Sequence, residues 1–192
     1  MDELRGIWEG LTVACVASGP SLTTEDCERA RHLPTVAVNT SFRRAPWAQV
    51  IYAQDDAWWR VHLEEVIATC TGLKYCHARN LRPRGVPGLN GQLWWKCGGN
   101  SGAGAINIAS YAGAKTIILL GYDCKFSAGG QRHWHADHPK GLTNSLSIER
   151  WPGQFAKVST AARSAGVRVV NCSRETALNC FERGDLETVL RT

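Results

Sequence analysis

LTVACVASGPSL, residues 11–22, is the stretch of sequence that most strongly indicates the fold. Its first seven residues are apolar or β-branched, which is typical of a strand buried on both faces of a parallel sheet. The run stops at Ser18-Gly19-Pro20-Ser21, where glycine and proline predict a tight turn. This junction predicts the first strand of an α/β domain, followed by a turn at the edge of the sheet where such domains bind ligands.

Strands and helices alternate outward from this stretch. Strands are expected over 36–38, 48–53, 73–76, 116–120 and 167–170, and helices over about 24–32, 57–69, 102–112 and 151–165, with two short helical pieces at the end. The Gly-, Pro- and His-rich stretches 77–99 and 124–150 are expected to be irregular. This alternation predicts a Rossmann-like, mostly parallel sheet with helices on both faces, in a single domain over 1–192.

One helix carries a clear apolar pattern. In the helix expected over 57–69, an apolar stripe is predicted to face the core, formed by Trp58, Val61, Leu63, Val66 and Ile67. Trp58-Trp59 and Trp94-Trp95 are adjacent pairs among eight tryptophans. Such pairs can stack on a base or sugar, or pack in the core or between subunits of a homo-oligomer.

Composition and charge limit the class of protein. Hydrophobic residues make up 44% of the 192 and charged residues 20%, as in a soluble globular domain. No apolar run approaches the roughly 20 residues of a membrane span, and the start of the chain lacks a secretory signal, so we expect a cytoplasmic protein. The net charge of +5 is scattered, which favours an anionic small ligand or weak contact with nucleic acid, although solvated faces give the same count.

The eight cysteines are expected to be reduced thiols, because no CxxC pair and no export signal is present. A zinc site formed by Cys76, His77 and Cys97 is the alternative, but these residues lack the paired spacing of zinc ligands.

Polar residues follow the predicted strands at their carboxyl ends, and one polar group opens a predicted helix. The candidate nucleotide-binding residues are Ser18, Gly19, Pro20, Ser21, Asn39, Thr40, Asp55, Asp56, Asn100, Ser101, Gly102, Gly121, Tyr122 and Asp123. Open α/β sheets bind ligands at this edge, and a helix N-terminus favours phosphate. Turns and helix caps would use the same residue types, but their agreement at five termini favours a binding crevice. GxGxxG and P-loop motifs are both absent.

HWHADH, residues 133–138, is the second candidate for chemistry. Histidine suits proton transfer near neutral pH, and Asp137 could orient a neighbouring imidazole. The candidate catalytic residues are His133, His135, Asp137 and His138. The same group could hold a divalent metal, or could be a solvated polar loop.

The motif VACVASGPSL (residues 13–22) resembles the opening of the bacterial sialyltransferases of glycosyltransferase family forty-two. It also resembles the related motility accessory factors and archaeal 6-hydroxymethylpterin diphosphokinases. The later motifs agree in order over about residues 11–181. They are Asn39, Asp55-Asp56, Asn100-Ser101-Gly102, Ile118 to Asp123, and the histidine-rich segment. Ser18 stands where the sialyltransferases have Asn, and the short histidine-rich form is more similar to phage-borne relatives of unknown function.

The resemblance implies that Ser18 to Ser21, Asn39, Ser101 and Gly102 contact the nucleotide of a CMP-sugar-like donor. It also implies that one of the three histidines of the 133–138 segment is the general base that deprotonates an unknown acceptor. Such a transfer needs no metal or other cofactor.

The sequence is therefore consistent with three alternative functions. The first is a metal-independent, nucleotide-sugar-dependent glycosyltransferase. The second is a diphosphokinase-like enzyme with Mg²⁺ near Asp55, Asp56 or Asp123. The third is a non-catalytic protein that binds a nucleotide or nucleic acid.

Overall fold

A computed structural model of the chain describes residues 2–77, 89, 91–93, 99–139, 142 and 148–191. These residues form an eight-stranded sheet in the order β5-β4-β3-β2-β1-β6-β7-β8, and all neighbouring strands are parallel. The strands are β1 Thr12–Val16, β2 Thr35–Val38, β3 Val50–Tyr52, β4 Leu73–His77, β5 Gly91–Leu93, β6 Thr116–Leu120, β7 Arg168–Asn171 and β8 Glu182–Arg183.

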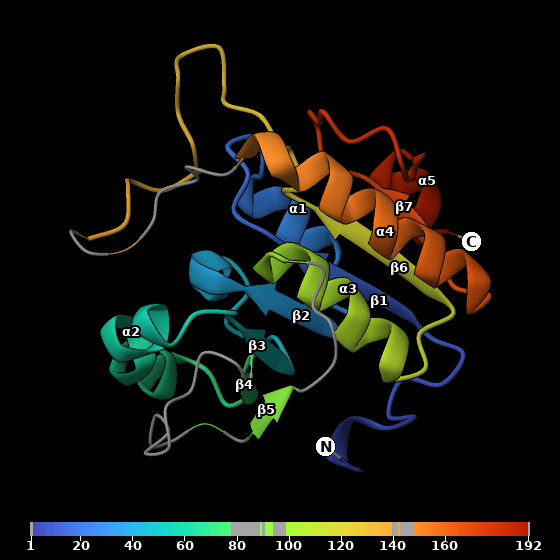
Figure 1. Cartoon of the computed structure of the whole chain (residues 1–192). Helices are drawn as coiled ribbons and strands as arrows, with labels where there is room; N and C mark the ends of the chain where they lie inside the picture. The colour runs from blue at the N-terminus through green and yellow to red at the C-terminus, as the bar shows by residue number, and fades with distance from the viewer. Residues whose placement is uncertain are drawn as a thin grey trace.

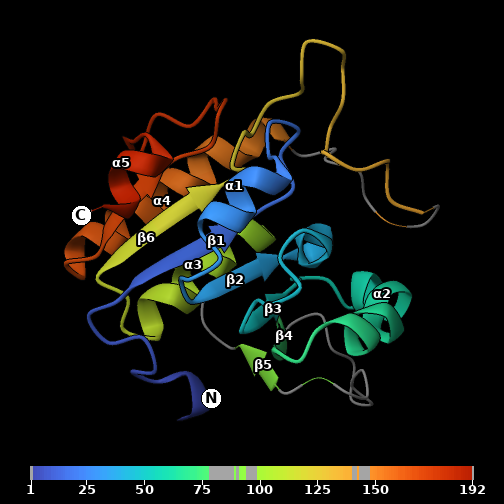
Figure 2. The ribbon, with the colours of Figure 1, turned by 180° about the vertical axis from the view of Figure 1, so that it is seen from behind.

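Helices cover both faces of this sheet. The α-helices are α1 Thr24–Arg29, α2 Asp56–Thr69, α3 Ser101–Tyr111, α4 Trp151–Ser164 and α5 Leu186–Leu190, and the 3₁₀ turns are η1 Asp2–Leu4, η2 Asn39–Arg43 and η4 Ile148–Arg150. Helices α3 and α4 lie in front of the sheet in Figure 1, whereas α1 and α5 lie on its opposite face in Figure 2. The residues of α2 pack on that second face, over β2, β3 and β4. The predicted Rossmann-like α/β fold is confirmed.

Strand β1 shows why the sequence specifies two helical layers. Val13 and Cys15 belong to the core under α3 and α4, whereas Ala14 and Val16 belong to the core under α1 and α5. All four are at most 1% exposed. Because side chains alternate along a strand, burial of both faces requires an unbroken apolar run, which is what residues 11–17 supply.

The order of the strands creates a switch point. From β1 the chain adds β2, β3, β4 and β5 on one side, and it then returns to place β6 beside β1 on the other side. Connections that diverge from two adjacent parallel strands leave a crevice at their carboxyl ends. The turn that begins at Ser18 and the residues from Gly121 onward leave the sheet at this crevice.

Some local predictions were wrong. The stretch 77–99, expected to be irregular, contributes the three-residue edge strand β5, which is defined by its pairing to β4. One of the two short helical pieces expected at the end is instead the strand β8, paired to β7. Helix α1 ends at Arg29 rather than near residue 32. These elements are too short for periodicity to specify, and partner strands fix the two short strands.

The predicted stripe of α2 is only partly right: Trp58 and Val66 are buried and Leu63 packs against the core, but the other two residues are not. Val61 and Ile67 are 50% and 55% exposed, whereas the buried residues of the helix are Trp58, Trp59, His62 and Val66. The indole of Trp59 donates to the carbonyl of Ala53. The Trp58-Trp59 pair thus packs in the core, and Trp94-Trp95 lies outside the described residues.

Two further expectations concern membranes and thiols. In the described part of the chain, none of the helices has the length and apolar character to cross a bilayer. The seven cysteines described there are free thiols, buried or half-buried. Cys97, the third member of the alternative zinc set, falls outside the described residues.

Candidate functional site

A cavity of about 290 Å³ opens at the carboxyl edge of the sheet, at the switch point between β1 and β6. Many residues predicted from the sequence line it: Ser18, Gly19, Pro20, Asn39, Asp55, Asn100, Ser101, Gly102, Gly121, Tyr122, Asp123, His133 and His138. Five other predicted residues do not line it: Ser21, Thr40, Asp56, His135 and Asp137. The structure therefore brings the strand ends and part of the histidine segment (residues 133–138) to one cavity.

The Ser18–Ser21 turn is fixed against the end of β6. The backbone N–H and the hydroxyl of Ser21 donate to the two carboxylate oxygens of Asp123, at 2.7 and 2.9 Å. Gly19 N–H donates to the carbonyl of Gly121 at 2.8 Å. Burial raises the pKa of Asp123, and the bonds from Ser21 act in the opposite direction. Asp123 is thus an anchor of the turn, and Ser21 is the residue that it holds.

The N-terminus of α3 forms another part of the wall. The Asn100 side chain caps the helix by accepting from Ala103 N–H at 2.9 Å, and it donates to Gln154 at 2.8 Å. The Ser101 hydroxyl accepts from Gln54 N–H at 3.0 Å, and the Tyr122 hydroxyl donates to the carbonyl of Gly102. These bonds hold the first turn of α3 at the cavity, where free backbone N–H groups favour an anionic ligand.

Backbone strain is concentrated in the same wall. Among the described residues other than glycine, Asn39 and Cys124 are the two with positive φ, at 50° and 49°. Asn39 directly follows β2, Cys124 follows Asp123, and both line the cavity. Strained backbone of this kind is enriched at binding and catalytic sites.

Three histidines of the histidine segment form a cluster beside the cavity. The centroid of the His133 ring lies 4.9 Å from that of His135 and 5.1 Å from that of His138. The centroids of the His135 and His138 rings are also 5.1 Å apart. His133 Nδ1 and the Ser18 hydroxyl oxygen are 3.2 Å apart. Burial, together with the neighbouring histidines, lowers the pKa of His133 and of His138 to about 4. Both are therefore neutral at pH 7 and able to accept a proton.

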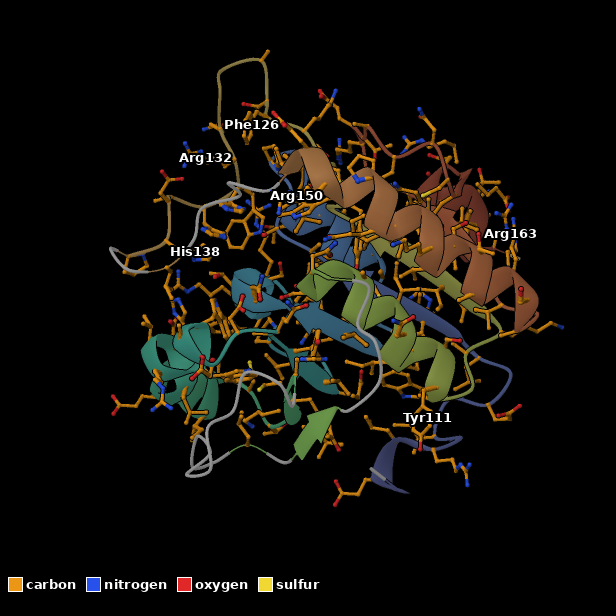
Figure 3. All side chains as sticks on the ribbon, in the orientation of Figure 1. Tyr111, Phe126, Arg132, His138, Arg150 and Arg163 are labelled. Carbon is orange, nitrogen blue, oxygen red and sulfur yellow. The ribbon has the colours of Figure 1, made fainter. Side chains whose placement is uncertain are left out.

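The histidine segment is attached to the body of the molecule through Trp134. The backbone N–H of Trp134 donates to the carbonyl of Ser18 at 3.2 Å. The indole ring packs against the core under α1 and α5. The Arg44 guanidinium lies 3.9 Å from the centroid of the Trp134 ring and also donates to the carbonyl of Leu22. Figure 3 shows Arg132 and His138 on this stretch between β6 and α4.

Several cavity residues were missed from the sequence. Lys125 and Arg132 bring positive charge to the wall, and Trp151 and Phe155 bring aromatic rings from α4. Lys125 pairs with Glu175 at 2.8 Å, and Arg132 lies 3.8 Å from Asp137. The cations gave no sequence signal beyond their place in a polar stretch after a strand. His62 of α2, which lies outside the cavity lining, was also missed, and the centroid of its ring lies 6.2 Å from that of His138.

Within the described part of the chain, the acidic side chains that line the cavity are Asp55 and Asp123. Burial raises the pKa of Asp55, and the neighbouring Asp56 raises it further. Among the described residues, no group of three His, Cys, Asp or Glu side chains is arranged to hold a metal ion.

The fold and the cavity define a class of protein: a Rossmann-like α/β domain with a polar pocket at its topological switch point. No protein-family model and no curated protein matches the sequence. The chain is similar in structure to the MAf glycosyltransferase from Magnetospirillum magneticum AMB-1, with a TM-score of 0.66 and 13% identity. The similarity covers 96% of this chain and 36% of that one, so this chain spans about a third of that protein's length. It shows a shared fold, as expected from the resemblance to the motility accessory factors.

Proposed function

We propose that this chain is a glycosyltransferase that takes its sugar from a nucleotide-activated donor. The observation that carries the proposal is the composition of one cavity wall. The neutral imidazoles of His133 and His138, the cations Lys125 and Arg132, and the N-terminus of α3 all line the same pocket. The structural similarity to a glycosyltransferase supports the proposal at the level of the fold.

The anionic part of the donor would bind at the start of α3. Helix N-termini favour phosphate, and Ser101 and Gly102 stand at the cavity wall. Lys125 and Arg132 would neutralise the phosphate as it leaves, as oriented cations do in phosphate chemistry. A cavity of about 290 Å³ lies just below the ~300 Å³ at which small-molecule sites usually begin, so it suits the nucleotide part of the donor rather than the whole donor.

A cavity histidine would act as the general base. The neutral imidazole takes the proton of the acceptor hydroxyl. At the same time, the acceptor oxygen forms a bond to the anomeric carbon of the sugar, and the bond between that carbon and the phosphate oxygen of the donor breaks. We assign this role to His138, which lines the cavity and packs beside His133 in the histidine cluster. The reaction as proposed uses no metal ion and no other cofactor.

The first experiment is a thermal-shift panel of nucleotides and nucleotide sugars. A ligand present at 100 times its Kd stabilises the fold by about 2.7 kcal/mol. Ligands found in this way are then tested for sugar transfer and for donor hydrolysis, with and without a chelator. We expect turnover that survives the chelator, and stabilisation by the free nucleotide of the same donor. Absence of stabilisation by any nucleotide would contradict the proposal.

The other two functions give distinct results in the same panel. A strict Mg²⁺ requirement with a nucleoside triphosphate would indicate the diphosphokinase-like enzyme, with Asp55 near the metal. Tight nucleotide binding without any product would indicate a binding protein.

A further inference from the structure

Helix α2 turns a histidine toward the interior. His62 is 6% exposed, on the buried face of the helix with Trp58 and Val66. Its ring lies 4.7 Å from the ring of Trp58. A core-facing helix position is ordinarily apolar, because each imidazole nitrogen that is removed from water needs a hydrogen-bonding partner.

One nitrogen of His62 faces a carboxylate. Its Nδ1 lies 3.7 Å from Glu65 Oε2, and Glu65 is held in turn by two bonds from the Arg43 guanidinium, at 2.6 and 2.7 Å. The other nitrogen, Nε2, is buried and has no hydrogen-bonding partner among the residues that the structure describes. A hydrogen on Nδ1, toward Glu65, leaves Nε2 as an acceptor.

The ring of His62 also neighbours that of His138, which belongs to the cavity wall. The two imidazoles meet edge to face, with centroids 6.2 Å apart and planes at 63°. Glu65, His62 and His138 therefore form a series that runs from a partly exposed carboxylate to the cavity. Hydrogen bonds of a catalytic series are often long without substrate and shorten when it binds.

We propose that His62 is a positioning residue, whose Nε2 accepts a hydrogen bond from an N–H of His138 and thereby leaves the other nitrogen of His138 unprotonated toward the cavity. The inference rests on the proposed function, in which His138 is the base. The base of a catalytic triad is oriented by a third group in the same way. When His138 takes the proton of the acceptor hydroxyl, the imidazolium that forms keeps its bond to His62 and loses the new proton to solvent after product release.

The charges around His62 are consistent with an acceptor role. Burial and the Arg43 guanidinium lower the pKa of His62, while Glu65 acts to raise it. The imidazoles of His135 and His138 also lie near it. The lowered pKa of His62, beside the Arg43 guanidinium, favours the neutral imidazole, and a neutral imidazole can accept a hydrogen bond.

The experiment compares two variants that differ in the ability to accept a hydrogen bond. His62→Gln keeps an amide oxygen, whereas His62→Leu fills the core position with an apolar group. The control is His32→Leu, at an exposed histidine beyond the end of α1. Nitrogen NMR of the imidazoles, with the His138 signals identified by their loss in His138→Asn, reports which nitrogen carries hydrogen. We expect one His138 tautomer to predominate in the wild type, His62→Gln and His32→Leu, and both tautomers to be populated in His62→Leu. An unchanged tautomer ratio in His62→Leu overturns the proposal.

Kinetics supply the second measurement. We expect His62→Leu to lower kcat for the nucleotide sugar about 10- to 100-fold and to move the acid limb of the pH–rate profile, with the donor KM within about twofold. His62→Gln should recover most of kcat, which a merely structural role for His62 does not predict. A wild type without turnover would overturn the glycosyltransferase assignment, whereas the tautomer ratio would still decide whether His62 bonds to His138.

A metal arm completes the test. The apoprotein is titrated with Co²⁺ and followed by visible absorption. We expect no stoichiometric complex. A tight one-to-one complex that is lost in His62→Leu would overturn the proposal and would make these histidines metal ligands.

Discussion

Gly19 shows what one residue of the Ser18–Ser21 turn must satisfy. A Cβ at this position would lie 2.3 Å from the Asp123 carboxylate and 2.5 Å from the carbonyl of Gly121. The glycine is therefore required by the contact between the β1 turn and the end of β6, whatever the ligand. The sequence indicated Gly19 as part of a tight turn and a candidate nucleotide-binding residue, and the structure adds close approach of the chain to itself.

We expect Gly19→Ala to lower the free energy of unfolding by about 1–3 kcal/mol, because the added methyl group overpacks this contact. Gly153→Ala is the control. In α4 the Cβ of residue 153 would meet no atom within 4 Å, and alanine is favoured over glycine in a helix by about 0.5–1 kcal/mol. Urea denaturation of both variants measures the difference. Equal stability of Gly19→Ala and the wild type would contradict the role of Gly19 in packing.

His138, the proposed general base, is the residue that the second variant replaces. His138→Asn is expected to reduce turnover of the donor about 10²- to 10⁴-fold, the contribution usual for general acid–base catalysis, with nucleotide binding retained. The matched variant is His135→Asn, at a histidine of the same segment outside the cavity wall. Its effect should be smaller. Turnover by His138→Asn at the wild-type rate would move the base to another residue.

Among the elements, helix α3 links the fold to the candidate phosphate site. Asn100 caps the helix and also bonds to Gln154 of α4, so it sets both the end and the orientation of α3. We expect Asn100→Ala to cost about 1 kcal/mol of stability, as loss of an N-cap does, and to weaken nucleotide binding as well. Asp185→Ala removes the N-cap of α5, away from the cavity, and is the control.

Calorimetric titration with the nucleotide found in the thermal-shift panel separates the two effects. Both variants should lose stability, but Asn100→Ala alone should lose affinity. Equal affinities would show that the N-terminus of α3 does not hold the nucleotide.

The contact between Arg44 and Trp134 attaches the histidine segment to the rest of the domain. Arg44→Met keeps an aliphatic stem beside Trp134 but removes the cation from its ring, an interaction of about 0.5–2 kcal/mol. We expect faster hydrogen exchange at the backbone N–H of Trp134, which donates to the carbonyl of Ser18. We also expect lower turnover of the nucleotide-sugar donor. Arg31→Met is the matched control, because it removes a similar contact with Trp47, 4.5 Å from the ring centroid. Exchange at Trp134 that is equally fast in both variants would contradict this assignment.

For the whole molecule, Asp26 ties the first helix to the segment after β7. Burial acts to raise the pKa of Asp26, but hydrogen bonds from Arg174 and Thr23 outweigh it and hold this pKa below its usual value. A lowered pKa in the folded state stabilises the fold above the unfolded pKa, near 3.9, and this contribution is lost as the pH falls through the folded value.

We therefore expect the stability of the wild type to fall more steeply below about pH 4 than that of Arg174→Met. At pH 7 the variant should be less stable by up to about 1 kcal/mol, since Arg174 is half-exposed and its charge is screened. Urea denaturation at pH 7 and at about pH 3 gives the comparison. A difference between the two proteins that does not shrink at low pH would contradict this account.

The sequence by itself determined the α/β class and most of the elements. An apolar run such as residues 11–17 and the cap residues before α1 and α3 act locally, so a short window of sequence carries them. The same windows located the polar strand ends, because turns and helix starts have their own residue preferences. Many of those residues do line the cavity, although their contacts with a ligand stay a prediction.

Only the tertiary structure decided which of these residues share a pocket. Ser21 and Asp123 are 102 positions apart and meet because β6 pairs with β1, an order of strands that no local pattern encodes. The inward turn of His62 has the same origin. The face that α2 buries is the one that packs on β2, β3 and β4, and these partners lie outside the helix, so the periodicity of the helix alone indicates that face only in part.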